Sequence, residues 1–215
     1  KKVLGFECPE RFTGKTLRHA GHLGMGKGRA AITVNTDCRK YKINYSILES
    51  QADKFLKIFH QKQPKIKQVF HASVIKCLEK DRTLTAPVPY GIDAPKGGMR
   101  TFHERWNEDL FRQAFSYIPQ RTVSENIKAA ALRIHAQHKW IRILSESHDA
   151  LLTSVPIQRK LEAATILRTE LERPIDFSTC SIKRDKLVIP CEVEEGTNWL
   201  DFKKVKFILT EKEIA

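Results

Sequence analysis

Hydrophobic positions recur with the period of an amphipathic helix in four stretches of the chain: residues 51–63, 66–78, 122–138 and 157–171. Pro64 interrupts the pattern between the first two stretches. Pro156 stands directly before the last stretch, at a position that suits the first turn of a helix. We therefore expect helices at these four places.

Two other stretches predict strands. In residues 141–155, two short apolar runs flank a polar turn, which is typical of a hairpin. Residues 187–193 form an apolar run whose Pro190 indicates an edge strand or a bulge. A high density of proline and glycine predicts a long loop over residues 83–98. Elements in this order indicate an α+β fold, in one large domain or two small ones.

Basic residues follow a helical spacing near the N-terminus. Residues 10–23 read as a helix that ends at the glycine-rich stretch 24–28. Arg11, Lys15 and His19 lie four residues apart and so share one face of that helix. Cations spaced in this way suit a triphosphate, since each can meet a different phosphate oxygen. A solvated basic face is the alternative.

The polar turn of the hairpin holds Ser147, His148 and Asp149. A hairpin tip is a rigid place to hold one metal-binding aspartate beside one histidine. Aspartate is also a common turn residue, so an ordinary surface turn is the alternative.

A third candidate lies in residues 111–128. Arg112 and Gln120 stand eight residues apart and precede the helix expected over 122–138. Such a pair suits contacts to base or sugar edges in the minor groove of a duplex. A helix-entry segment with incidental polar residues is the alternative.

The charge of the chain narrows the class of partner. The chain has 38 Lys and Arg against 25 Asp and Glu, which gives a formal net charge of +13. This charge points to nucleic acid as the partner, with an affinity that weakens steeply as salt is added. No apolar run is long enough to span a membrane, and no basic amphipathic helix suits a membrane surface. The N-terminus lacks the apolar core of a signal peptide, so we expect a cytoplasmic protein. The five scattered cysteines suggest neither a zinc site nor a disulfide framework.

Together these segments resemble the C-terminal part of family A (Pol I-like) DNA polymerases, over residues 11 to about 202. The first resembles the fingers helix of the family, in a phage-type form with His19, and the second resembles the segment that leads into a long palm helix. The hairpin turn resembles the third palm motif, and the end of the chain resembles the closing motif of the family. The matching residues are Arg11, Lys15, His19, Gly24-Met25-Gly26, Arg112, Gln120, His148-Asp149, Ile189-Pro190 and Gly196-Thr-Asn-Trp199.

The resemblance implies a role for each candidate residue. Arg11 and Lys15 would bind the triphosphate of the incoming deoxynucleotide, and His19 would lie against its sugar or base. Arg112 and Gln120 would follow the minor groove of the primer–template DNA. His148 would sit near the primer terminus, and Asp149 would ligate two Mg²⁺ ions as the primer 3′-hydroxyl attacks the α-phosphate. Residues 1–80 would be a fingers-like helical segment and residues 81–215 the C-terminal part of the palm, with its antiparallel sheet and catalytic hairpin.

The chain departs from the family pattern at Leu23, Ser116, Arg121 and Ala150, where the family usually has Tyr, Asn, Gly and Glu. The second metal-binding aspartate of the family lies on a strand upstream of the fingers helix, and neither Glu7 nor Glu10 matches it. We therefore expect a polymerase fragment that is inactive alone and needs the upstream remainder of the enzyme. The alternative is a catalytically degenerate module that binds primer–template DNA without catalysis.

Overall fold

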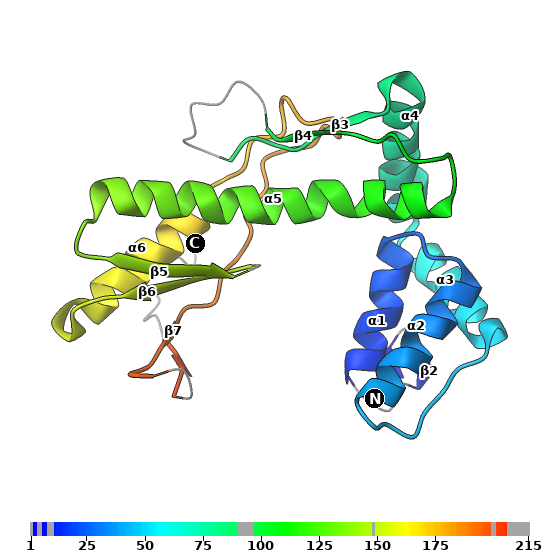
Figure 1. Ribbon diagram of the computed structural model, residues 1–215, viewed down its shortest axis with the longest axis horizontal. Helices are drawn as coiled ribbons and strands as arrows, with labels where there is room; N and C mark the ends of the chain where they lie inside the picture. Colours follow the sequence, from blue (N-terminus) through cyan, green and yellow to red (C-terminus); the bar gives the residue numbers. More distant parts are fainter. Residues whose placement is uncertain are drawn as a thin grey trace. The chain divides into compact units, whose positions relative to one another are not determined.

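Helices dominate the computed structural model, and every sheet among the described residues is a small antiparallel pair, so the expected α+β class is confirmed (Figure 1). The structure describes residues 2–3, 6–7, 11–89, 97–147, 149–198 and 201–205. The chain divides into two units. The first comprises Lys1–Thr85 with Met99–Pro119, and the second comprises Ala86–Gly98 with Gln120–Ala215.

The first unit is built around a helical group. Its elements are β1 (Lys2–Val3), β2 (Phe6–Glu7), α1 (Arg11–His22), α2 (Lys27–Lys40), α3 (Glu49–Lys62), the π-helical turn η1 (Ile66–His71), α4 (Ala72–Asp81), β3 (Thr83–Thr85) and β4 (Met99–Thr101). The helices expected over 10–23, 51–63 and 66–78 are thus confirmed. Thr83–Thr85 pairs with Met99–Thr101, so the long loop expected over 83–98 begins later than we expected.

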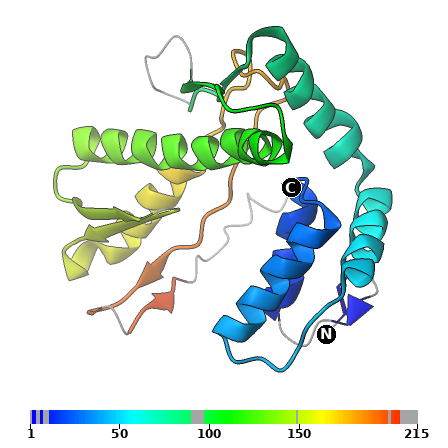
Figure 2. The same ribbon diagram turned by 45° about the vertical axis from the view of Figure 1, so that its right-hand side comes forward.

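Helix α2 has no counterpart among the expected elements. Its buried side chains are small: Ala30, Ala31, Val34 and Cys38. Small residues give only a weak hydrophobic periodicity, so the sequence pattern does not predict this helix. They also allow α2 to pack closely against α1 and α3, as Figure 2 shows for α1 and α2.

Aromatic packing sets the spacing of α1 and α3. Phe55 and Phe59 of α3 are fully buried, and Leu17 of α1 packs into the same core. Gly21 lies against Phe59 so closely that a Cβ there would come within 2.5 Å of the ring. A side chain at position 21 would therefore force α1 away from α3.

Helix α5 (Glu108–Gln137) contributes to both units. The side chain of Asn107 accepts a hydrogen bond from the Leu110 amide at 3.0 Å, which caps the start of the helix. The helix continues through Pro119, whereas the sequence predicted a start near residue 122. The helix expected over 122–138 is therefore present but begins earlier, because α5 tolerates a proline, a residue that usually ends a helix.

The second unit holds the expected hairpin. Strand β5 (Arg142–Ser147) pairs with β6 (Ala150–Ser154), with one bulge at Leu144. A short 3₁₀ turn, η2 (Ile157–Arg159), precedes α6 (Lys160–Leu171), so the expected helix is present but begins later. Apolar side chains of α5 and α6 form one core with the start of the hairpin: Ala130, Ile134, Ile141 and Ala163.

The strand expected over 187–193 is absent from the described residues. Only Leu187 makes a β-bridge, with Ile175, and the next strands are β7 (Glu194–Glu195) and β8 (Lys203–Lys204). Pro190 has no amide hydrogen to donate to a neighbouring strand. The Cys191 amide instead donates to Glu172 Oε1 at 2.9 Å, so a side chain takes the place of a strand partner.

A buried ion pair joins α5 to α6 in the second unit. Arg133 Nε lies 2.7 Å from Glu170 Oε2, and both side chains are less than a tenth exposed. Arg133 also donates to the Glu170 carbonyl at 2.8 Å, and Arg173 meets the other carboxylate oxygen at 2.6 Å. The buried Glu170 carboxylate is therefore compensated by two guanidinium groups.

We predict that Arg133→Met lowers the free energy of unfolding by about 3 kcal/mol, because it removes one partner of a buried carboxylate. Lys160→Met is the matched control, since Lys160 and Glu195 form an ion pair with both side chains over two-fifths exposed. That change should cost less than about 1 kcal/mol. Urea unfolding of both variants provides the measurement, and equal losses would contradict the prediction.

Candidate functional site

Helix α1 presents the basic residues of the first candidate segment to solvent. Lys15, Arg18 and His19 are exposed, whereas Thr13, Leu17 and Ala20 on the opposite face are buried. The helix is therefore amphipathic, and its polar face is cationic. Arg11 is the first residue of α1, and its side chain lies outside the described ones.

A glycine ends α1 as the sequence predicted. Gly24 has a φ of +65°, in the left-handed region. The Met25 amide donates to the Ala20 carbonyl at 2.9 Å, and the Gly24 amide to the Gly21 carbonyl at 3.4 Å. These two bonds form the Schellman motif, which satisfies carbonyl groups at the end of the helix. The cationic face is thus carried on a well-terminated helix.

His71 anchors the end of α1 within the first unit. Its Nε2 lies 2.7 Å from the carbonyl oxygen of His22 and donates to it, and its ring stacks on Phe115 of α5 with centroids 3.8 Å apart. No local sequence pattern signals this anchor, because residues 22, 71 and 115 meet only through tertiary packing.

Arg112 and Gln120 both lie on α5. Arg112 donates to Asp109 Oδ1 at 2.9 Å and is 28% exposed, so the aspartate already holds its guanidinium group. Gln120 is exposed. Arg112 belongs to the first unit and Gln120 to the second.

Arg121 stands where the resembled family usually has Gly, and in this structure it forms an ion pair with Glu125. Its Nε lies 2.6 Å from Glu125 Oε1, and the same oxygen accepts a hydrogen bond from the Gly98 amide at 3.0 Å. A Cβ at Gly98 would come within 2.5 Å of both side chains. Arg121 therefore helps to hold the segment that precedes β4.

Asp149 is exposed in the turn that joins β5 to β6. It lies between Ser147 and Ala150, which form the last pair of the hairpin. His148 lies outside the described residues. Among the residues that the structure describes, no group of three or more His, Cys, Asp and Glu side chains is placed to hold a metal ion. A carboxylate suits Mg²⁺, but one aspartate does not complete a two-metal site. The described donors therefore do not fit the two ions by themselves.

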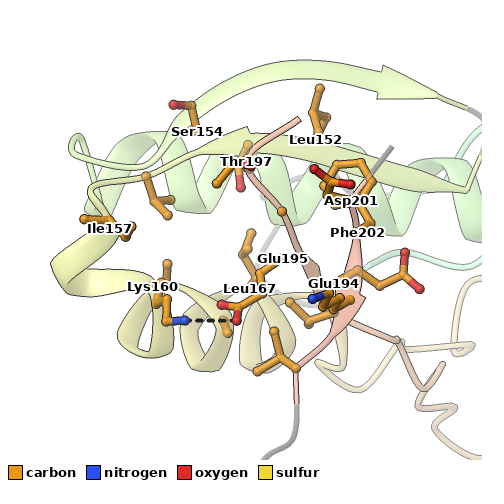
Figure 3. Close-up of a pocket in the computed structure, with 18 of the residues that line it drawn as sticks. Leu152, Ser154, Ile157, Lys160, Leu167, Glu194, Glu195, Thr197, Asp201 and Phe202 are labelled. Carbon is orange, nitrogen blue, oxygen red and sulfur yellow. Dashed lines mark hydrogen bonds and ion pairs between the residues drawn. The ribbon is translucent and has the colours of Figure 1, made fainter. Parts of the chain in front are cut away.

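The hairpin forms one wall of an open groove of about 960 Å³. Figure 3 shows Leu152 and Ser154 from the hairpin, Lys160 and Leu167 from α6, and Phe202 beside β8 around this space. Lys160 and Glu195 close one side of it with an ion pair at 3.0 Å. Aliphatic and polar side chains line the groove in similar number, and the turn residue Asp149 does not line it.

The candidate residues are thus distributed over two units. Lys15, His19 and Arg112 belong to the first unit, and Gln120 and Asp149 belong to the second. The first unit supplies exposed cations and the second an exposed carboxylate at a hairpin turn.

Comparisons with known proteins show the fold of the chain. No protein-family model matches the sequence, and no curated protein does so. Among solved structures, the chain is similar to the POL domain of Pol1 from M. smegmatis, in complex with DNA primer-template and dNTP, with a TM-score of 0.54 and 16% sequence identity. The match covers 75% of this chain and 27% of that one, so this chain spans about a quarter of the matched structure.

No helix in the described part of the chain is long and apolar enough to cross a bilayer.

The histidines around the His71 anchor give a prediction for pH dependence. Burial is the main cause that lowers the pKa of His22, His60 and His71, and the nearby charge of Lys67 lowers the pKa of His60 and His71 further. These groups are neutral in the folded state, whereas the unfolded chain takes up protons below about pH 6.5. The contribution of these neutral histidines to the free energy of unfolding is therefore complete above that pH. It is lost as the pH falls through their lower folded-state pKa values.

We expect the free energy of unfolding to fall by about 1 kcal/mol or more between pH 7.5 and 5.5. His71→Gln should reduce this dependence, because it removes one of the buried titrating groups. His135→Gln, at an exposed position of α5, is the control and should leave the slope unchanged. Urea unfolding at several pH values measures the slopes, and identical slopes for the two variants would refute the assignment.

Proposed function

We propose that this chain is the fingers and palm portion of a DNA-directed DNA polymerase, which binds primer–template DNA and deoxynucleoside triphosphates. The observation that supports it is the fold similarity to a polymerase domain over 75% of the chain, together with the four ordered motifs. Under this proposal residues 1–80 act as fingers and residues 81–215 as the C-terminal part of the palm, in a cytoplasmic enzyme.

The cationic face of α1 would receive the triphosphate. Lys15 and His19 are exposed on adjacent turns, and Arg11 lies one turn before Lys15 on the same helix. Among the described residues, Lys15 forms no ion pair with a carboxylate, so its ammonium group is available for a phosphate oxygen. Hydrogen bonds between ammonium and phosphate are charge-assisted and therefore strong.

The long helix α5 would follow the minor groove of the duplex. Gln120 is exposed and offers both a donor and an acceptor to base edges. Arg112 would exchange its bond to Asp109 for a sugar or base contact. That exchange keeps the guanidinium group hydrogen-bonded in both states and so lowers the cost of binding.

Asp149 would supply one carboxylate to the catalytic centre, with His148 beside the primer terminus. Mg²⁺ commonly binds through one or two carboxylates together with substrate phosphates. A second carboxylate would come from the upstream remainder of the polymerase, as the family pattern implies. The contribution of this chain is then to bind and position the nucleotide and the primer end.

A second candidate is a module that binds primer–template DNA without catalysis. The single carboxylate at the hairpin turn and Ala150 in place of the usual Glu favour it. Binding would depend on phosphate contacts and would therefore weaken with salt, but it would not respond to Mg²⁺ or to the loss of Asp149.

We expect Lys15→Ala to weaken deoxynucleotide binding about tenfold or more, because it removes a charge-assisted bond to the triphosphate. Lys54→Ala on α3 removes an exposed cation outside the basic face of α1 and is the matched control. Titration of the full-length protein with a fluorescent deoxynucleotide, in the presence of primer–template DNA, measures both. Unchanged nucleotide affinity in Lys15→Ala would exclude the proposed role of α1.

We expect Asp149→Asn in the full-length protein to reduce Mg²⁺-dependent primer extension about 100-fold or more, since a metal centre that loses a carboxylate loses several kcal/mol of transition-state stabilisation. Primer–template affinity should stay within about twofold of wild type. Glu146→Gln changes another exposed acid on the same hairpin and should retain extension. If wild type binds the duplex but neither protein extends the primer, the binding-only candidate is the better one.

A further inference from the structure

Trp106 is an exposed aromatic residue in the segment between β4 and α5 of the first unit. Its exposed fraction is 47%, whereas the neighbouring Phe102 is fully buried. The side chain therefore lies at the surface of the first unit. An indole ring left half in solvent is available to a ligand.

The surroundings hold this ring in place. Arg82 ends α4 in the left-handed conformation, with a φ of 57°, and its Nε donates to the Phe102 carbonyl at 2.7 Å. A second nitrogen of Arg82 donates to the Glu104 carbonyl. The same guanidinium lies 5.5 Å from the centroid of the Trp106 ring. The segment before Trp106 is therefore fastened to the end of α4 by one arginine.

Phe111 of α5 supports the ring from another direction. Its centroid lies 5.1 Å from that of Trp106, at an interplanar angle of 85°, which is the edge-to-face geometry that aromatic pairs prefer. Because Arg82 and Phe111 both restrain the indole, a ligand that stacks on it loses little side-chain entropy. Trp106 is thus rigid as well as exposed.

The segment around Trp106 carries charges of both signs, with Glu108 exposed and the Asp109 carboxylate paired with Arg112. Arg105 is exposed beside Trp106 in sequence, and His103 is also exposed. The carboxylate of Glu104 is compensated by Arg100 at 2.9 Å. An exposed aromatic ring beside an exposed arginine suits single-stranded nucleic acid, because a base can stack on the ring while the adjacent phosphate meets the guanidinium group.

We propose that Trp106 is a stacking platform for an unpaired nucleobase of single-stranded DNA next to the duplex. The inference rests on the proposed function, since it adds a site for the single strand to a chain that binds primer–template DNA. Arg105 would meet the adjacent phosphate. Stacking accepts all four bases, so this site adds affinity without sequence preference.

Binding of two DNA substrates to the full-length protein tests the proposal. One is a primer–template with an eight-nucleotide 5′ overhang of thymidines, and the other is the same duplex with blunt ends. Trp106→Ala should weaken binding of the overhang substrate about tenfold and leave the blunt duplex within about twofold. Trp106→Phe keeps an aromatic face and should restore most of the affinity.

Tyr41→Ala is the matched control. Tyr41 is a surface aromatic of similar exposure, 59%, and Lys40 lies 5.5 Å from its ring centroid, but it stands at the end of α2. The Tyr41→Ala variant should bind both DNA substrates with the affinity of wild type. Thermal unfolding of each variant shows whether the fold is retained.

The outcomes separate this inference from the proposed function. If wild type binds both substrates and Trp106→Ala weakens neither, or weakens both equally, the stacking site is refuted while the duplex-binding function stands. If folded wild type binds neither substrate, the proposed function itself fails. A loss confined to the overhang substrate, rescued by Trp106→Phe, supports the inference.

Discussion

The continuity of α5 through Pro119 is the constraint on which the rest of the fold depends. Leu110, Ala114 and Phe115 of this helix are buried in the first unit, and Ala130 and Ile134 are buried in the second. Proline cannot donate to the carbonyl four residues earlier, which usually breaks a helix at a cost of about 3 kcal/mol. Core contacts on both sides of the proline offset that cost, so one helix serves two cores.

Each unit also fastens α5 by a polar contact of long sequence separation. In the first unit, His71 joins the end of α1 to Phe115 by a hydrogen bond and a ring stack. In the second, Arg133 and Glu170 join α5 to α6 near the core that supports the hairpin. The elements that carry Lys15 and Asp149 are therefore positioned by buried partners, whereas Lys15 and Asp149 themselves remain exposed to meet a ligand.

The distribution of charge unites the proposed activities. The exposed cations of α1 and Arg105 belong to the first unit and suit phosphates, and Trp106 of the same unit suits an unpaired base. The second unit contributes one exposed carboxylate at the hairpin turn, which is a partial donor set for Mg²⁺. The proposed polymerase chemistry thus needs a further carboxylate, and DNA binding needs none.

The sequence by itself determined the α+β class, the helices at 10–23, 51–63 and 66–78, the hairpin around Asp149 and the cationic face of α1, because each follows from local periodicity and turn chemistry. Only the tertiary structure decided that α2 packs through small residues, that α5 runs through Pro119, and that the Glu172 side chain replaces a strand partner at Cys191. It also decided that Trp106 lies exposed beneath the guanidinium of Arg82. These features depend on contacts between residues far apart in sequence, and a local sequence pattern cannot predict such contacts.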